Sequence, residues 1–417
     1  MSVPDSASVR PENLVNGVQV MIVIIGVAIT IPAFLVGGQL VEGLGIRRAA
    51  IAISVGAAAV AAIASLTMTL AVRTRWTTYQ IVSQPFGELG GKVVSLVMAT
   101  SLLGWFGVTA ALFGQALGAA VLTVTGVDLP AWSMTLTGSA LMIVTTLYGF
   151  SAIERLSRFV VPLLCVLLVV AAWKSLVLLS AGPAEAAATA PAGLRTIGAG
   201  ISVVISAYMV AVTIAPDIAR FIKTRPQAVA AAVGGYGVGY GGVLLLAGIP
   251  ALLAVEGGYI AQLVMLGLGV PALLLVVLAT WTTNCSNLYS ASLGYDSVIK
   301  PRAYKPVVLA LGAAGTLAGL LGIADNLVPY LVVLSIAIPP ISGIYLTHYL
   351  VPGRAPVSDQ SGFRLAALVA WVVATALAWF GAQGAIQLTG VPSLDSFLAA
   401  ALAYAMLARI SAATTKD

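Results

Sequence analysis

Long apolar runs separated by short polar stretches dominate the chain. The first run extends from Val18 to Leu44 and carries no charge before Glu42. A helix that crosses a bilayer needs about 20 mostly apolar residues. Runs of this length recur and predict twelve transmembrane helices, at about 17–43, 49–72, 92–124, 131–151, 158–180, 196–222, 228–254, 260–295, 305–323, 327–350, 363–383 and 391–409. The third and eighth are long, so we expect them to tilt or to extend past the bilayer.

Composition supports an all-α polytopic membrane protein. Of the 417 residues, 60% are hydrophobic and only 8% are charged, whereas soluble domains contain about 25% charged residues. The polar start from Met1 to Pro11 is untypical of a cleavable signal peptide. Cys165 and Cys285 lie in separate apolar segments, which predicts buried thiols and no disulfide.

The basic residues predict the orientation in the lipid bilayer. With a cytoplasmic N-terminus, Arg47, Arg48, Lys174 and Arg195 fall outside, and the other 16 of the 20 Lys and Arg residues fall inside. Because basic residues collect in cytoplasmic loops, this asymmetry supports twelve spans with both termini cytoplasmic. The cytoplasmic excess of basic residues also explains the net charge of +6, so we expect no nucleic-acid partner. We expect an integral protein of a bacterial inner (plasma) membrane.

The polar stretches divide the chain into a core and an accessory part. Residues 1–16 form a cytoplasmic tail and 17–350 a ten-helix core, followed by a cytoplasmic linker at 351–362, two accessory helices within 363–409 and a tail at 410–417. The sixth span resembles the first, because small polar residues and a proline interrupt both. Two five-helix inverted repeats, at about 17–180 and 196–350, would bring both interrupted helices to one central site.

The middle of the first span is unusual for a simple membrane anchor. Gly26, Thr30 and Pro32 lie near half depth. Proline removes a backbone donor and clashes with the preceding turn, and lipid offers no partner for the carbonyls that are freed. A broken helix at this depth is typical of a transport site. The alternative is a proline kink with no role in binding.

The eighth span offers ligands for a cation. Ala279, Thr282 and Thr283 stand at i, i+3 and i+4, which places them on one helix face. Two hydroxyls and one carbonyl there would join the carbonyls of Gly26 and Ile29. Five neutral oxygens suit a monovalent cation such as sodium. The alternative is that each threonine hydroxyl bonds to the backbone of its own helix.

Two aromatic and two amide residues are candidates for substrate binding. Trp105 in the third span and Tyr208, near the expected break of the sixth, would stack on a flat heteroaromatic ring. Asn284 and Asn287 would read the ring edges with donors and acceptors. Asparagines of this kind also hold membrane helices together, and that alternative remains open.

No catalytic set of acid, base and nucleophile is apparent, so we expect no enzyme and no cofactor other than a coupling ion. His348 is the only histidine. Asp217 and Arg220 are expected to pair at the membrane interface. The apparent lack of a deep carboxylate favours a cation over a proton relay. A channel is less consistent with broken helices, because alternating access needs an occluded site.

Several motifs resemble those of the cytosine permeases in the nucleobase:cation symporter-1 family. They are Pro85-Phe-Gly87, Gly104-Trp-Phe-Gly-Val108, Asp217 to Phe221, Trp281-Thr-Thr-Asn284 with Leu288-Tyr289 and Leu293-Gly294, and Ala337-Ile-Pro-Pro340. The resemblance runs from about Gly26 to the end of the tenth span. It implies a leucine-transporter-like fold with discontinuous helices one and six.

The resemblance also implies roles for particular residues. The implied substrate contacts are Trp105, Ala207, Tyr208, Thr30, Thr109 and Asn284, and the implied sodium ligands are Gly26, Ile29, Ala279, Thr282 and Thr283. Cys285 and Ser286 stand where the family carries acid or amide side chains, which makes Cys285 a further candidate contact.

The sequence therefore predicts a secondary transporter that imports a nucleobase or related planar heterocycle by sodium symport with alternating access. A cytosine-like pyrimidine is the favoured substrate. Tyr208 and Ala207 replace the Phe and Ser of the family, so another pyrimidine fits the altered pocket as well. The alternative is a proton-coupled symporter of a purine, a hydantoin or a vitamin-precursor pyrimidine.

Overall fold

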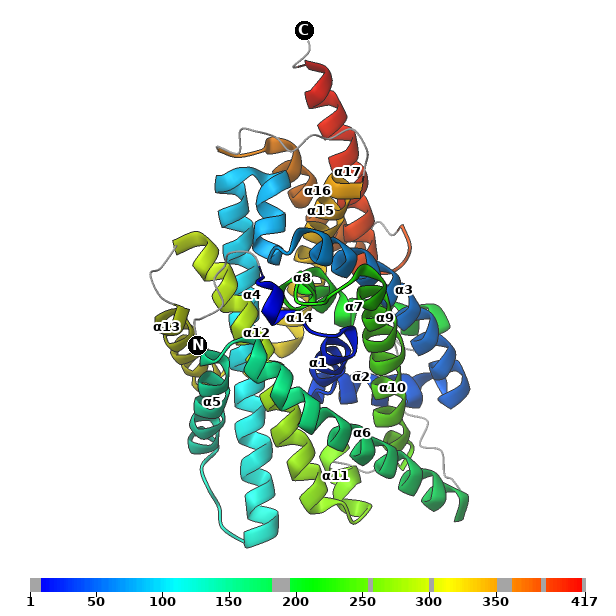
Figure 1. Cartoon of the computed structure of the whole chain (residues 1–417). Helices are drawn as coiled ribbons and strands as arrows, with labels where there is room; N and C mark the ends of the chain where they lie inside the picture. Colours follow the sequence, from blue (N-terminus) through cyan, green and yellow to red (C-terminus); the bar gives the residue numbers. More distant parts are fainter. Residues whose placement is uncertain are drawn as a thin grey trace.

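The computed structural model describes residues 9–181, 196–253, 258–299, 304–350, 362–383 and 388–414. Within these ranges the regular structure is helical, apart from one isolated bridge between Val15 and Ile222. Figure 1 shows long helices packed around shorter, interrupted ones. The α-helices are α1 (Gly17–Ala28), α2 (Ile31–Leu44), α3 (Ile46–Thr74), α4 (Thr78–Thr125), α5 (Ala131–Leu147), α6 (Phe150–Ala181), α7 (Ile197–Ile214), α8 (Pro216–Ala219), α9 (Arg225–Ala232), α10 (Tyr240–Gly248), α11 (Gly258–Met265), α12 (Gly269–Ile299), α13 (Tyr304–Leu320), α14 (Leu327–Ala337), α15 (Pro339–Leu350), α16 (Leu365–Ala382) and α17 (Pro392–Thr414).

The first predicted span is two helices, α1 and α2, which meet at an angle of 71°. The backbone leaves the helical conformation at Ile29 and Thr30. The Thr30 hydroxyl then caps α2 by accepting a bond from the Ala33 N–H at 3.2 Å. Pro32 lies in the first turn of α2, where its missing N–H costs no helical hydrogen bond. The break therefore precedes the proline.

The sixth predicted span is interrupted later than expected. Helix α7 is continuous through Tyr208 and ends at Ile214, after which Ala215 leads into the short α8. Tyr208 therefore lies within a regular helix, and the expectation that it marks the break was wrong. The reason is that Pro216 starts a new helix at its own position, where proline is tolerated, and leaves the preceding turns intact.

The two long predicted spans also differ from expectation: α4 starts well before the predicted 92–124 and is kinked in that added part, and the span at 260–295 is divided. Helix α4 contains a kink at Gly87, whose φ of 78° is a left-handed conformation that glycine adopts without strain. The predicted span at 260–295 consists of α11 and α12, separated at Gly267 with a φ of 71°. Glycine at these positions lets the chain change direction within a continuous apolar run.

Within the described residues, nine helical segments are long and apolar enough to cross a membrane, or ten if α1 and α2 count as one span. Helices α5 and α13 are apolar but shorter. The predicted total of twelve spans and the inverted repeat both stay predictions. The cysteines agree with expectation only in part: both are free, and Cys285 is buried, but Cys165 is partly exposed.

Candidate functional site

The broken end of α1 meets the middle of α12. The Thr283 hydroxyl of α12 donates to the Gly26 carbonyl at 3.3 Å. A side chain at Gly26 would bring its Cβ to 2.7 Å from Val161 of α6, so glycine allows this close approach. The same Cβ would lie 3.7 Å from the Thr282 hydroxyl oxygen. The structure thus brings Gly26, Thr282 and Thr283 together.

The remaining predicted cation ligands border this cluster. The Thr282 hydroxyl donates to the Ala279 carbonyl at 2.9 Å and to the Leu278 carbonyl at 3.2 Å, so this threonine does bond to its own helix. A donating hydroxyl keeps its lone pairs for a cation. Ile29 is fully buried and directly follows α1. All five predicted ligand groups are uncharged oxygens; the structure joins Gly26, Thr282 and Thr283 at the break, and links Ala279 to them through Thr282.

A cavity of about 410 Å³ lies beside this cluster. Its walls come from α1, α2, α4, α7, α8, the π-helical segment Val233–Gly239, α10, α12, α14 and the first residue of α17. Of the predicted substrate contacts, the cavity is lined by Thr30, Trp105, Ala207, Tyr208 and Asn287. Thr283 also lines it. One residue therefore faces both the cavity and the Gly26 carbonyl.

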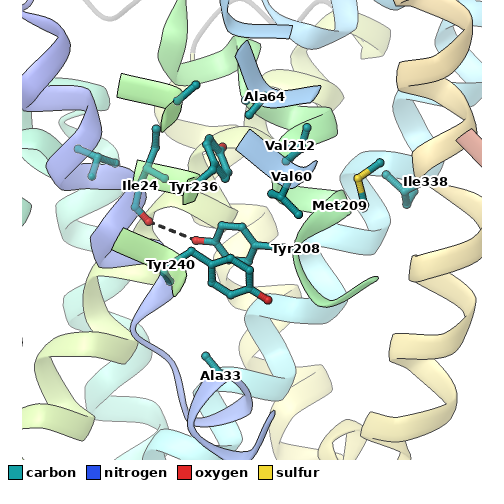
Figure 2. Packing of buried hydrophobic residues seen from close by; sticks show 14 of the residues in the cluster. Ile24, Ala33, Val60, Ala64, Tyr208, Met209, Val212, Tyr236, Tyr240 and Ile338 are labelled. Carbon is teal, nitrogen blue, oxygen red and sulfur yellow. Dashed lines mark hydrogen bonds between the residues drawn. The ribbon is translucent and has the colours of Figure 1, made fainter. Parts of the chain in front are cut away.

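Tyrosines form one wall of the cavity. Figure 2 shows Tyr208 with its ring against Tyr240 and its hydroxyl directed at Ile24. The Tyr208 and Tyr240 ring centroids are 4.1 Å apart at an interplanar angle of 11°, and the Tyr208 hydroxyl donates to the Ile24 carbonyl at 3.2 Å. Tyr236 packs edge-on to Tyr208 at 5.5 Å. This arrangement fixes the Tyr208 ring and ties α7 to the end of α1.

Sequence reasoning missed Tyr236 and Tyr240, although both line the cavity. They stand four residues apart, which places them on one helix face. Tyr236 lies in a π-helical segment, Val233–Gly239, between α9 and α10. Such segments occur often at functional sites. The glycine-rich stretch around these tyrosines was the available signal.

Trp105 reaches the cavity from α4. Its ring stacks on Tyr330 of α14, with centroids 6.3 Å apart and an interplanar angle of 22°. The Tyr330 hydroxyl in turn donates to the Ser101 carbonyl. Trp105 and Tyr208 thus line one cavity from different helices, and each is held by an aromatic neighbour.

Three predicted substrate contacts lie outside the cavity lining: Thr109, Asn284 and Cys285. The Thr109 hydroxyl donates to Asn284 Oδ1, and Asn284 Nδ2 donates to the Phe106 carbonyl at 3.1 Å. The Cys285 thiol is directed to the Met142 carbonyl at 3.5 Å. These side chains are buried between α12 and its neighbours α4 and α5, because Asn284 and Cys285 lie on faces of α12 other than the one that carries Thr283, and Thr109 of α4 packs against Asn284.

The chain resembles known permeases over most of its length. It is 28% identical over 400 residues to the cytosine permease of Escherichia coli (strain K12), a match that covers 95% of this chain and 92% of that permease. It is 24% identical over 390 residues to the hydantoin permease of Microbacterium maritypicum, covering 87% and 78%. The resemblance to the nucleobase:cation symporter-1 family is confirmed. No family profile matches the chain.

A solved structure shares the fold. It is a nucleobase-cation-symport-1 family transporter in a closed conformation with bromovinylhydantoin bound. The TM-score is 0.82 at 21% identity, and the match covers 99% of this chain and 96% of that one. The predicted fold class is therefore confirmed. Because the matching relatives are permeases and not enzymes, the chain is a permease-type transporter of the membrane.

The two asparagines of α12 are expected to differ in function. Asn284 does not line the cavity and has its amide engaged by Thr109, Phe106 and Asn287, so Asn284→Ala should lower binding of all bases by a similar factor and destabilise the protein by about 1–3 kcal/mol. Asn287 lines the cavity, so Asn287→Ala should change the order of preference among bases. Thermal unfolding of the purified variants and competition by cytosine, uracil, adenine and hypoxanthine test this. A changed base order in Asn284→Ala would contradict the structural role.

The expected interfacial pair of Asp217 and Arg220 was wrong. Both side chains are buried, at 0% and 1% exposed. Asp217 accepts from the Thr78 N–H at 2.8 Å, and Arg220 donates to the Tyr289 hydroxyl at 3.2 Å. Within the described part of the chain, no ion pair joins the two residues, and Asp217 Oδ2 has no hydrogen-bond partner. Burial follows from the tertiary packing of α8 on α3, with Thr78 of α4 and Tyr289 of α12 contacting the two side chains.

Proposed function

We propose that this protein is a sodium symporter of an uncharged, planar nucleobase-like heterocycle, with a cytosine-like pyrimidine as the first candidate. The observation that carries the proposal is the position of Thr283. Its hydroxyl contacts the carbonyl of Gly26 within the neutral oxygen cluster, and its side chain lines the cavity with Trp105 and Tyr208. A cation site and an aromatic site that share one residue are suited to cotransport.

The lining supports an uncharged substrate. None of the described residues that line the cavity is Asp, Glu, Lys, Arg or His. Burying an ionised group without a counter-charge is costly. Nucleotides and heterocyclic carboxylates therefore fit the cavity poorly, whereas a neutral ring with a few donors and acceptors fits it well. Uncharged oxygens next to the cavity suit sodium, because carbonyls at unwound helix ends coordinate it in transporters.

The end of α1 is the element that would couple the two ligands. Ile24 accepts a bond from Tyr208, and Gly26, half a turn later, accepts one from Thr283. A sodium ion that orders these carbonyls would also order the aromatic wall. Such coupling is reciprocal by thermodynamic necessity. Sodium and substrate should therefore raise each other's affinity by the same factor, about 5- to 150-fold for a coupling of typical size.

Transport by purified protein tests the proposal. In proteoliposomes, uptake of labelled cytosine should require an inward sodium gradient and should not follow a pH gradient alone. Substrate titrations at several sodium concentrations, and sodium titrations at several substrate concentrations, should give equal coupling factors. Uptake that is unchanged when potassium replaces sodium would overturn the sodium assignment, and an absence of binding for every heterocycle tested would overturn the substrate class.

Proton coupling is the second candidate mechanism, and the burial of Asp217 favours it. This carboxyl group lies on α8, next to Ile218 of the cavity lining, and keeps one oxygen without a partner among the described residues. A buried ionisable group of this kind is typical of a proton relay. If protons drive uptake, Asp217→Asn should remove the response to a pH gradient while substrate binding persists.

The proposed setting is a bacterial inner membrane with both termini cytoplasmic and a ten-helix core followed by two accessory helices. The cavity would open alternately to the two sides of the membrane. The segments 1–8, 351–361 and 415–417, which carry parts of the predicted tails and the linker, lie outside the described residues.

A further inference from the structure

The start of α17 lies at the cavity wall. Pro392, its first residue, lines the cavity, and the Ser393 hydroxyl lies 3.0 Å from the hydroxyl of Ser206 on α7. Ser206 lines the cavity as well. The sequence divides off this last helix as an accessory element, yet it packs on α15, α14 and α7. In Figure 1, α17 (red) runs along α15 and α16.

This end of α17 is held firmly in place. The Asp395 carboxylate accepts bonds from the N–H groups of Leu388 and Thr389, at 3.0 and 2.7 Å. Ser393 and Ser396 are fully buried. A fixed polar group at a cavity wall can select among ligands, because its position does not adapt to each of them.

Ser206 faces a different part of the cavity from the tyrosine wall. Ser206 and Tyr208 are two residues apart on a regular helix, so their side chains leave α7 about 200° apart. Ala207 lies between them and also lines the cavity. A ring above the small Ala207 side chain would have the Tyr208 wall on one side and Ser206 on the other.

We propose that Ser206, held in place by Ser393, is a specificity residue that binds an exocyclic amino group of the heterocycle, so that α17 positions part of the substrate site. Ser393 is fully buried and does not itself line the cavity, so it acts through Ser206. This inference rests on the proposed function. Either hydroxyl can be the donor within the pair. In either direction the Ser206 hydroxyl keeps a lone pair that can accept a bond from an amino group in the cavity, and Ser393 fixes its orientation.

A matched pair of ligands tests the subsite. Cytosine and pyrimidin-2-one share a ring and differ in the exocyclic amino group. In full-length protein in nanodiscs, Ser206→Ala and Ser393→Ala should each lower cytosine affinity by about 2- to 10-fold and leave pyrimidin-2-one affinity unchanged. Ser396→Ala is the control, because this hydroxyl bonds to the Ser393 carbonyl within α17 and does not line the cavity. An equal loss for both ligands would mean that the pair only joins two helices and would overturn the proposal.

Cysteine labelling tests the position of α17 without any substrate. Pro392→Cys should react with a small water-soluble methanethiosulfonate reagent, and Ser396→Cys should not. The natural Cys165 and Cys285 give the background in the unsubstituted protein. Protection of Pro392→Cys by cytosine would support the subsite. No reaction at Pro392→Cys would overturn the inference that α17 lines the cavity. If Pro392→Cys reacts but the protein binds no heterocycle, the position of α17 stands and the proposed substrate is overturned.

Discussion

Replacing Thr282 and Thr283 together by valine is expected to abolish the sodium dependence of substrate binding while the protein remains folded. Valine keeps the branched shape of threonine and removes both hydroxyl oxygens. The Thr283 hydroxyl contacts the Gly26 carbonyl, and the Thr282 oxygen lies close to the same glycine. Loss of a polar contact to a charged group costs about 1.5–3 kcal/mol, so each threonine should account for roughly a 10- to 100-fold change in sodium affinity.

The measurement is substrate binding to purified protein over a range of sodium concentrations. Thr316→Val is the matched control, because Thr316 is buried in α13 and its hydroxyl bonds to the Gly312 carbonyl of its own helix at 2.7 Å. This variant should keep the sodium response of the unsubstituted protein. Sodium dependence that survives in the double variant would remove the cation assignment, whatever the effect on stability.

Replacing Trp105 by alanine is expected to weaken heterocycle binding by about 1–3 kcal/mol, the range for stacking of a base on an aromatic side chain. Tyr208→Ala should have an effect of similar size, because both rings line the cavity. Tyr208→Phe keeps the ring and its stack on Tyr240 and loses the bond to the Ile24 carbonyl. Its cost should be smaller, about 0.5–1.5 kcal/mol, and should appear mainly as weaker coupling to sodium, because Ile24 belongs to α1.

Isothermal titration with cytosine in saturating sodium gives these differences directly. Trp173→Ala is the control, because Trp173 of α6 is 62% exposed on the apolar surface and does not line the cavity. It should bind substrate like the unsubstituted protein. Full affinity in Trp105→Ala would contradict stacking and remove the main support for a heterocyclic substrate.

The sequence alone determined the membrane class and was sufficient to predict most residues of the proposed cation site. Apolar runs of bilayer length leave few alternatives to helices, because lipid cannot satisfy backbone groups. The threonine pair of α12 and the break near Thr30 could both be predicted from the sequence, because helical spacing and proline chemistry are local properties. The motifs around Trp105 and Thr282 also sufficed to indicate the family.

Only the tertiary structure decided which side of each helix meets the cavity. Asn284 follows Thr283 directly in the sequence, yet it is turned toward α4, because a step of one residue rotates the side chain by about 100° around the helix. Asp217 is buried for the same kind of reason, because the packing of neighbouring helices, and not its nearness to a basic residue, sets its exposure. The cavity is also lined by residues from distant parts of the chain, namely Tyr236, Tyr240 and the start of α17. Local sequence patterns could not predict this, because they carry no information on the rotation and neighbours of a packed helix.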